Sequence, residues 1–490
     1  MRLAAVLFAW VLTACATGAP VNAPASVPRG PHVEREVDAG DDVIVLALSG
    51  GGARAASFSL GVMQGMRAMR ARDGRALLDH VVLISSVSGG SILSAYYGLH
   101  GADGLDTFRA AYLDKQWRLN STFSPVSWWN AARGGVNGPN RLADWLDREI
   151  YRGARFAALR GPRIALNAAD LYNATPFAFT NFYFDGVCSD LSSVRVADAV
   201  AASMAVPMAF RPVLVEAFPG DTCPEPDWIA PALSDRHAPE FLRMTARAFR
   251  NYRAPRRQRY LHLVDGGVVD NLGVTSLSVA HAALGAPAPL TPREAVRARR
   301  IVFLVVNSEY IRARDFQLDA ASPGGGEMLY SSLDIATDAA KRAALDAFRA
   351  NLPEMAAALR RYRCGLAPRE VRALRGSTEG WACSDLAVSL EVIAIADLPP
   401  AQYEALIGTP TLATPRSKRY RTSAARRGYP FQASGAAPKQ GVRHVWRMAE
   451  KASVSPHCPE KRLSYATLDG HNGRLCGQDA RPERGVGALA

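Results

Sequence analysis

The chain has 490 residues, which is enough for one large domain or two smaller ones. Hydrophobic residues make up 48% of it and charged residues 21%, a composition that excludes a disordered protein. No apolar run reaches the roughly 18 residues that a membrane-spanning helix needs, which excludes a polytopic membrane protein. The net charge is +13, with 52 Arg and six Lys among the 58 cationic residues, and the seven cysteines are an odd number.

The N-terminal residues are typical of an export signal. Arg2 supplies a positive charge, residues 3–12 are apolar, and small residues precede Cys15. The sequence Leu-Thr-Ala-Cys at 12–15 resembles a bacterial lipobox, which implies cleavage before Cys15 and lipidation of that residue. An ordinary signal peptide is the alternative. A buried first strand is disfavoured, because residues 16–31 are rich in Ala and Pro.

Lipidation of Cys15 would anchor the protein to a membrane of the bacterial cell envelope, since lipoproteins of this kind carry several acyl chains. An Asp after the lipidated Cys tends to retain lipoproteins at the inner membrane. Ala16 occupies that position here, so we expect the outer membrane.

Short apolar runs of strand length recur along the chain and alternate with helical or irregular stretches. They span residues 43–48, 81–85, 163–167, 213–216, 260–264 and 301–307. Helical character follows the first run at 54–72 and the second at 91–99. This alternation predicts an α/β fold with a mostly parallel central sheet and helices on both faces.

Two stretches depart from this alternation. Residues 107–133 are rich in large aromatic residues, which either pack this excursion or form a lid or membrane-contact surface. They are Trp117, Phe123, Trp128 and Trp129. From residue 353 the pattern is irregular. Residues 416–427 are strongly basic, and we interpret them either as a solvated surface or as a site for anionic lipid head groups. Because no nucleic-acid motif accompanies the basic residues, we expect no nucleic-acid partner.

A glycine-rich turn, Gly-Gly-Gly-Ala-Arg at 50–54, leaves the first strand and opens a helix. Backbone N–H groups at such a helix N-terminus bind negative charge. A dinucleotide site would need an acidic residue at the end of the next strand, and a phosphate loop would need Gly-Lys-Ser/Thr; neither is present. An oxyanion hole and a purely structural turn remain.

The second strand passes into a helix through Ser86-Val87-Ser88-Gly89-Gly90. A nucleophile elbow needs this layout, because a sharp turn with small neighbours exposes the central Ser hydroxyl. Its usual form is G-x-S-x-G, so Ser86 replaces the first Gly, and Ser88 alone has the central position. Ser85 and Ser91 fit caps or packing positions.

A later apolar strand ends in Asp265-Gly266-Gly267. A carboxylate at the carboxyl end of a strand lies where open α/β sheets bind ligands. An ordinary turn Asp is the alternative, and Asp270 and Asn271 fit caps of the following turn.

In this order, these three motifs resemble those of the patatin-like phospholipase family. A fourth stretch, residues 201–212, resembles the A-S-x-A-x-P-x-x-F-x-P segment of that family, and the resemblance covers about residues 43–276. It implies a three-layer sandwich with Ser88 as nucleophile and Asp265 as general base. The implied oxyanion hole and supporting residues are Gly50, Gly51 and Gly52, then Arg54, Gly90, Gly266 and Gly267. The departures are Ser86 at the first elbow position and Ala55 where many members have Gly.

The resemblance implies a Ser-Asp dyad, since alternation along the strand points His262 away from Asp265. No cofactor or metal is expected. We predict a serine lipid acyl hydrolase of phospholipase A or lysophospholipase type that acts on membrane phospholipids. The alternatives are a non-catalytic lipoprotein scaffold and an esterase for other substrates. The predicted segments are a signal peptide at 1–14, a flexible tether at 15–40, the hydrolase core at 41–352 and a C-terminal extension at 353–490.

If Cys15 carries the lipid, six cysteines remain for an oxidising compartment, and they allow fifteen pairings. Sequential pairing closes the shortest loops and is our prediction. The cysteines are Cys188, Cys223, Cys364, Cys383, Cys458 and Cys476. A zinc site formed by the last two with His457 and His471 is a less favoured alternative.

Overall fold

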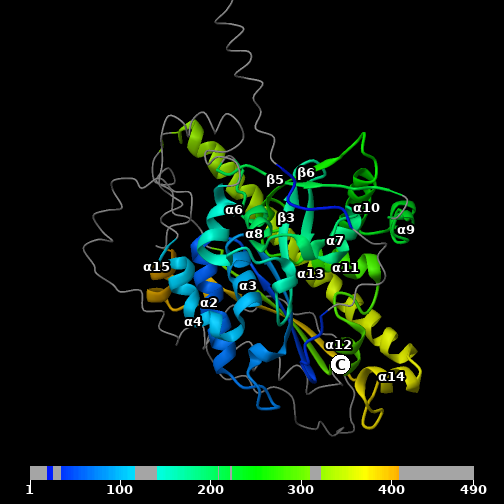
Figure 1. Ribbon diagram of the computed structural model, residues 1–490. Coiled ribbons are helices and arrows are strands. Elements are labelled where there is room, and N and C mark those ends of the chain that lie inside the picture. Colours follow the sequence, from blue (N-terminus) through cyan, green and yellow to red (C-terminus); the bar gives the residue numbers. More distant parts are fainter. Residues whose placement is uncertain are drawn as a thin grey trace, which may run out of the picture. The chain divides into compact units, whose positions relative to one another are not determined.

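The computed structural model describes residues 19–25, 35–115, 141–207, 209–220, 223–309, 320 and 322–407 (Figure 1). Its strands are β1 (Asp42–Leu48), β2 (Val81–Val87), β3 (Arg163–Asp170), β4 (Thr175–Phe179), β5 (Val213–Glu216), β6 (Tyr260–Asp265), β7 (Arg300–Asn307) and β8 (Ala387–Ala394). Its helices are α2 (Gly52–Ala68), α3 (Gly89–His100), α4 (Gly104–Phe108), α6 (Arg141–Leu146), α7 (Asn181–Gly186), α8 (Val196–Ser203), α9 (Ile229–Ser234), α10 (Glu240–Tyr252), α11 (Thr275–Leu284), α12 (Pro292–Arg297), α13 (Gly325–Gly365), α14 (Pro368–Arg375) and α15 (Pro400–Ile407).

The strands form one mixed sheet in the order β5-β6-β3-β2-β1-β7-β8, with β4 paired to β3. The pairs β2–β3, β1–β2, β1–β7 and β7–β8 are parallel. The pairs β3–β4, β3–β6 and β5–β6 are antiparallel. The predicted mostly parallel sheet is therefore confirmed, and all six predicted strands are present.

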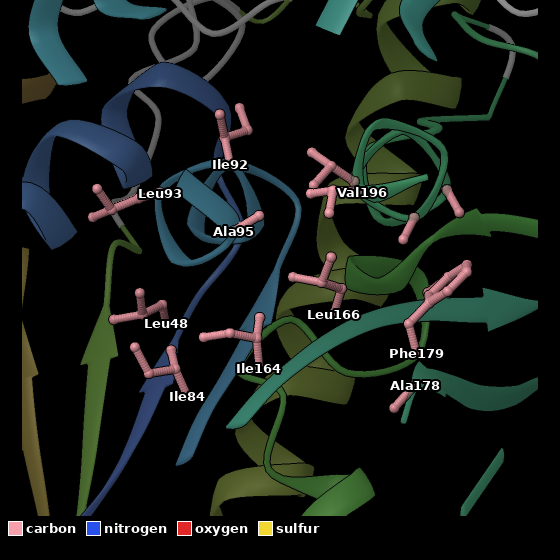
Figure 2. Close-up of a cluster of buried hydrophobic side chains, with 14 of the residues drawn as sticks. Leu48, Ile84, Ile92, Leu93, Ala95, Ile164, Leu166, Ala178, Phe179 and Val196 are labelled. Carbon is pink, nitrogen blue, oxygen red and sulfur yellow. The ribbon is translucent and has the colours of Figure 1, made fainter. Parts of the chain in front are cut away.

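Both faces of the sheet are covered, because side chains alternate along each buried strand. On β1, Ile44, Leu46 and Leu48 belong to one core cluster, together with residues of α2, α3 and α8. Val43 and Val45 belong to a second cluster with residues of α11, α12 and α13. Figure 2 shows part of the first cluster, where Leu48 and Ile84 from neighbouring strands lie below α3.

The elements that were not predicted from the sequence include β4, β8 and the long helix α13. The boundary predicted at residue 352 falls inside α13, which passes through Pro353. On either side of that proline, Phe348 and Met355 pack in the second core cluster. Beyond it, β8 pairs with β7. The sheet and its cover therefore continue past residue 352, and this boundary does not separate two structural units.

Part of the segment predicted as a flexible tether is bound to the domain. The Val21 N–H donates to the Leu214 carbonyl on β5 at 3.0 Å. The Asn22 side chain accepts from the Glu216 N–H at 2.9 Å and donates to the Glu216 carbonyl at 2.8 Å. Residues 21–22 thus follow the edge strand β5, whereas residues 15–18 and 26–34 lie outside the described residues.

Sequential cysteine pairing is confirmed for the two pairs that the structure describes. Disulfides join Cys188 to Cys223 and Cys364 to Cys383. The predicted Cys458–Cys476 pair, its zinc alternative, the aromatic residues at 117–129 and the basic stretch at 416–427 lie outside the described residues.

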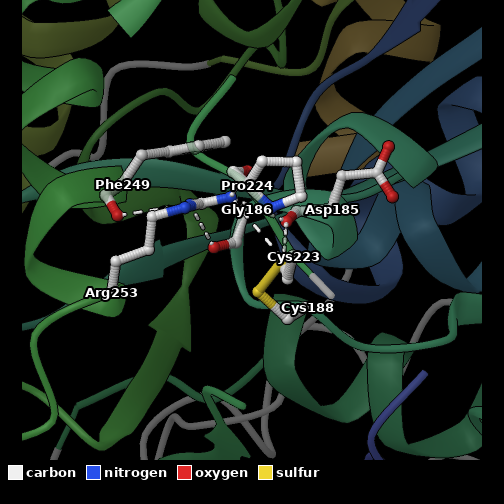
Figure 3. The surroundings of a disulfide bond; sticks show 7 residues. All are labelled: Asp185, Gly186, Cys188, Cys223, Pro224, Phe249 and Arg253. Atoms are coloured by element: carbon white, nitrogen blue, oxygen red, sulfur yellow. Dashed lines mark hydrogen bonds between the residues drawn. A yellow bond between two sulfur atoms is a disulfide. The ribbon is translucent and has the colours of Figure 1, made fainter. Parts of the chain in front are cut away.

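The first disulfide is accompanied by an arginine that binds the same loop (Figure 3). Arg253 donates to the Gly186 carbonyl at 2.8 Å and to the Pro224 carbonyl at 3.2 Å. The loop that contains Cys223 is therefore fastened both covalently and by hydrogen bonds. Within the described ranges, no helix is both long and apolar enough to cross a bilayer.

Candidate active site

Ser88 lies in a strained turn between β2 and α3. Its φ is 48° and its ψ is −115°, a backbone conformation that non-glycine residues rarely adopt. A strand that enters such a turn and leaves it as a helix has the geometry of a nucleophile elbow. The sharp turn predicted from the sequence is therefore present at Ser88.

The glycines after Ser88 allow its turn to touch the glycine-rich turn after β1. A Cβ on Gly89 would lie 2.0 Å from the Gly52 carbonyl oxygen, and one on Gly90 would lie 2.6 Å from the Leu48 carbonyl oxygen. Neither distance leaves room for a side chain. The two turns, which 30-odd residues separate in the sequence, are consequently in direct contact.

Strand β3 brings Asp265 to Ser88. On one edge, β3 pairs with β4 through residues 166–170. Two strands share the other edge of β3. Residues 163–167 of β3 pair with β2, so that Val87 lies opposite Asn167. Residues 168–170 pair with β6, so that Asp265 lies opposite Ala168. The carboxyl ends of β2 and β6 thus meet end to end at two consecutive residues of β3.

The sequence predicts Asp265 at the ligand-binding carboxyl edge of an open α/β sheet, but β6 is not parallel to its neighbours. Strand β6 is antiparallel to β3, and Asp265 approaches Ser88 from the opposite direction. The Ser88 hydroxyl lies close enough to the Asp265 carboxylate to lower its pKa. A base within hydrogen-bond reach is what a serine nucleophile requires.

Burial raises the pKa of Asp265 from its ordinary value of 3.8 to about 6. Two neighbouring groups act in the opposite direction and limit the rise: the Gly267 N–H donates to Oδ1 at 2.8 Å, and the Ser88 hydroxyl also favours the ionised carboxylate. A carboxylate with a pKa near 6 is a much better proton acceptor at neutral pH than a solvated one.

Close backbone contacts explain the Asp-Gly-Gly sequence. A Cβ on Gly266 would lie 2.4 Å from the Asn167 carbonyl oxygen, and one on Gly267 would lie 2.8 Å from the Asn271 side-chain oxygen. The next acidic residue, Asp270, accepts the N–H groups of Leu272 and Gly273, so it caps the following turn as predicted.

The three glycines predicted to form an oxyanion hole differ in their N–H groups. The Gly50 N–H donates to the Asn271 carbonyl at 3.0 Å, so its donor is already engaged. Gly51 is the N-cap of α2 and Gly52 is its first residue, with φ values of 134° and 63°. N–H groups at a helix N-terminus have no intrahelical acceptor. Gly51 and Gly52 are therefore the residues that can supply donors.

A serine outside the predicted site holds this turn. The Ser308 hydroxyl, directly after β7, donates to the Gly50 carbonyl at 2.6 Å, and the Ser308 N–H donates to the Ser49 hydroxyl at 2.9 Å. The predicted supporting residue Arg54 is buried and donates to the Ser308 carbonyl. Nothing in the sequence around Ser308 marked it for this position.

Buried serine hydroxyl groups hold the elbow through hydrogen bonds. The Ser203 hydroxyl accepts the Ser88 N–H at 2.8 Å and donates to the Asn167 carbonyl at 2.6 Å. Ser91 bonds to Ser203 at 2.8 Å and donates to Ser86 at 3.3 Å. Ser86, which replaces the usual glycine, is thus fully buried within a polar network. Ser203 belongs to the segment at 201–212, which is the signal that could have identified it.

Two exposed valines lie near Asp265 in the chain or through its backbone hydrogen bond. Val206 follows Ala205, whose carbonyl accepts the Asp265 N–H, and Val268 lies three residues after Asp265. Both valines are more than a third exposed. His262 is exposed on β6, and no histidine contributes to the pKa of Asp265. Within the described part of the chain, no group of three or more His, Cys, Asp or Glu residues could hold a metal ion.

Comparison with known proteins identifies a family for this region. Residues 46–278 match the family model of patatin-like phospholipase. No curated protein matches the sequence significantly. Among solved structures, human GIVD cytosolic phospholipase A2 is 14% identical over 54% of this chain and 43% of that chain, with a TM-score of 0.29. The present chain spans less than half of that protein.

Proposed function

Since residues 46–278 of the chain belong to the patatin-like phospholipase family, we propose that the protein is a serine lipid acyl hydrolase with a Ser88–Asp265 dyad. The observation that carries this proposal is that β3 brings Ser88, in its strained turn, together with a buried carboxylate whose pKa is about 6. The general class of lipid ester hydrolase follows from the family, and the dyad and the substrate are our proposal.

In the proposed reaction, ionised Asp265 takes the proton from the Ser88 hydroxyl as its oxygen attacks the acyl carbonyl carbon. The N–H groups of Gly51 and Gly52 donate to the oxyanion of the tetrahedral intermediate. When the intermediate collapses, the ester bond breaks, and protonated Asp265 returns the proton to the departing alcohol or lysophospholipid. Asp265 then activates a water that hydrolyses the acyl-serine, which releases the fatty acid and restores Ser88.

We propose fatty-acyl esters of membrane phospholipids as the substrates. Two exposed valines support an apolar acyl group: Val206 follows Ala205, whose carbonyl accepts the Asp265 N–H, and Val268 lies three residues after Asp265. We further propose that Cys15 is lipidated and anchors the enzyme in the bacterial envelope, at the outer membrane. A lipid anchor would keep the enzyme at the surface that contains its substrate.

Mass spectrometry of the products released from mixed phospholipid vesicles tests this function. Wild-type protein should release free fatty acid and a lysophospholipid, and Ser88→Ala should release neither while keeping its fold. A fluorophosphonate should label wild-type protein at Ser88 and leave Ser88→Ala unlabelled. Absence of labelling in the wild type would favour a scaffold, and hydrolysis of short soluble esters alone would favour an esterase of other substrates.

A further inference from the structure

Two neighbouring apolar side chains stand exposed at the turn that joins β3 to β4. Leu171 is 58% exposed and Tyr172 is 66% exposed. The loop that leads into β6 contributes exposed Arg256 and Arg257, and the first residue of β6 is exposed Tyr260. We call these five residues the β3–β4 tip. Adjacent exposed apolar residues beside cations are unusual on a protein surface that meets only water.

A buried polar network holds the turn and the loop together. Asp170, which is fully buried, accepts the Tyr172 N–H at 3.1 Å and a Gln258 side-chain N–H at 3.2 Å. The Leu171 N–H donates to the His262 carbonyl on β6 at 3.1 Å. The tip is therefore a fixed part of the fold whose side chains are held in the exposed position.

The charge of the tip is positive. Within the described ranges, neither Arg256 nor Arg257 forms an ion pair with a carboxylate. The next arginine, Arg259, pairs with Glu216 at 2.8 Å and lies over the ring of Tyr260, 5.2 Å from its centroid. This combination suits an interface with an apolar interior and an anionic surface. The apolar pair of the tip would contact the interior, and Arg256 and Arg257 would contact the anionic surface.

The tip and the candidate active site lie at the same end of two parallel strands: Ser88 follows the carboxyl end of β2, and Leu171 follows the carboxyl end of β3. Strand β3 runs parallel to β2, and Asn167 pairs with Val87, next to Ser88. From Asn167 the chain continues four residues to Leu171, a distance of about 13 Å along the strand. A surface bound by the tip would therefore lie close to Ser88.

The N-terminal segment reaches the same part of the sheet. Asn22 is bonded to Glu216, and Glu216 pairs with Tyr260 of the tip. Cys15 lies six positions before Val21, which is bonded to Leu214 of the same strand as Glu216. An extended chain of that length spans at most about 20 Å. A lipid on Cys15 would thus hold β5 and β6 within that distance of a membrane.

We propose that the β3–β4 tip binds the surface of an anionic lipid bilayer and thereby presents Ser88 to lipid in that surface. The proposal rests on the proposed function, because it names the surface from which the enzyme takes its substrate.

Vesicle binding by catalytically silent protein tests the tip. Full-length chain with Cys15→Ser and Ser88→Ala is sedimented with phosphatidylcholine vesicles that contain or lack phosphatidylglycerol. We expect tighter binding to the anionic vesicles. Arg256→Gln with Arg257→Gln should weaken it by roughly 25-fold, at about fivefold for each arginine. Leu171→Ser with Tyr172→Ser should weaken it about tenfold. The apolar N-terminal residues are common to all variants.

The matched control is Arg369→Gln with Arg372→Gln on α14. Both arginines are exposed. Helix α14 packs on α12, which directly precedes β7, so these arginines are near the amino ends of the parallel strands, whereas the tip follows the carboxyl end of β3. We expect this variant to bind as tightly as the parent. Equal binding by the tip variants and the parent would overturn the proposal. So would an equal loss in the α14 control, because the overall charge would then explain the attraction.

Activity of the same variants with an intact Ser88 separates this proposal from the proposed function. The tip variants should hydrolyse vesicle phospholipid more slowly and a short soluble ester at the parental rate. If the parent hydrolyses no ester, the proposed function fails, whereas the binding result still decides the role of the tip. Unchanged unfolding temperatures would show that all variants are folded.

Discussion

Asp265→Asn is expected to abolish hydrolysis and to stabilise the protein at neutral pH. A pKa of about 6, against an ordinary value of 3.8, means that the folded protein holds the proton more tightly than the unfolded chain does. The difference corresponds to about 3 kcal/mol. Stability therefore falls as the pH rises from about 4 to about 6, and it stays lower at higher pH. Asn remains neutral and does not carry this cost.

Thermal unfolding at a series of pH values measures the effect. Above about pH 7, Asp265→Asn should unfold about 3 °C above wild type for a chain of this size, and near pH 4 the difference should be small. Asp346→Asn, at an exposed carboxylate on α13, serves as the control and should change stability by less than about 0.5 kcal/mol. Removal of the Ser88 hydroxyl in Ser88→Ala should raise the pKa of Asp265 further, because that hydroxyl favours the ionised carboxylate.

Two outcomes would refute this reasoning. In the first, Asp265→Asn is less stable than wild type at pH 8, which would mean that the carboxylate is stabilised by contacts stronger than the cost of its burial. In the second, the variant is more stable by the same amount at every pH, so the gain could not come from ionisation. Either outcome would remove the physical basis for Asp265 as a base poised near neutrality.

Two further changes test the elbow. Gly89→Ala should abolish fluorophosphonate labelling, because its Cβ would lie 2.0 Å from the Gly52 carbonyl oxygen; labelling at the wild-type rate would contradict the contact between the two turns. Ser203→Ala leaves the Ser88 N–H and the Asn167 carbonyl without their partner, at about 1–3 kcal/mol of stability for each buried group, and should slow labelling of Ser88. Denaturant unfolding and labelling rates would measure both effects, and unchanged values would refute the positioning role of Ser203.

The apolar runs of the sequence predict the central strands well, because strands buried on both faces need continuous apolar residues. Strand β4 was missed since Pro176 lies within it, a residue that usually argues against a strand. Strand β8 was missed because Ser389 and Glu391 interrupt its apolar residues. It pairs only with β7 at the edge of the sheet, where polar side chains are tolerated.

The sequence predicts the motifs of the site, but it does not predict how the fold brings them together. Ser88, Asp265 and the glycine turn are identified by local sequence, because each needs a special turn. Their meeting depends on the pairing register of β3, which no local pattern specifies. The hydroxyl of Ser203 could not be assigned to the Ser88 N–H for the same reason: serine is common in buried turns, and only the fold selects its partner.

The shared edge of β3 has a consequence for how this chain tolerates changes in length. Ser88 and Asp265 are 177 positions apart in the sequence, and loops between them can gain or lose residues without altering the register of either strand. One residue inserted between Asn167 and Ala168 would instead displace β6 by about 3.3 Å along β3 and turn its side chains to the other face. Strand β3, which carries neither the nucleophile nor the base, is thus a part of the chain in which the dyad does not tolerate an insertion.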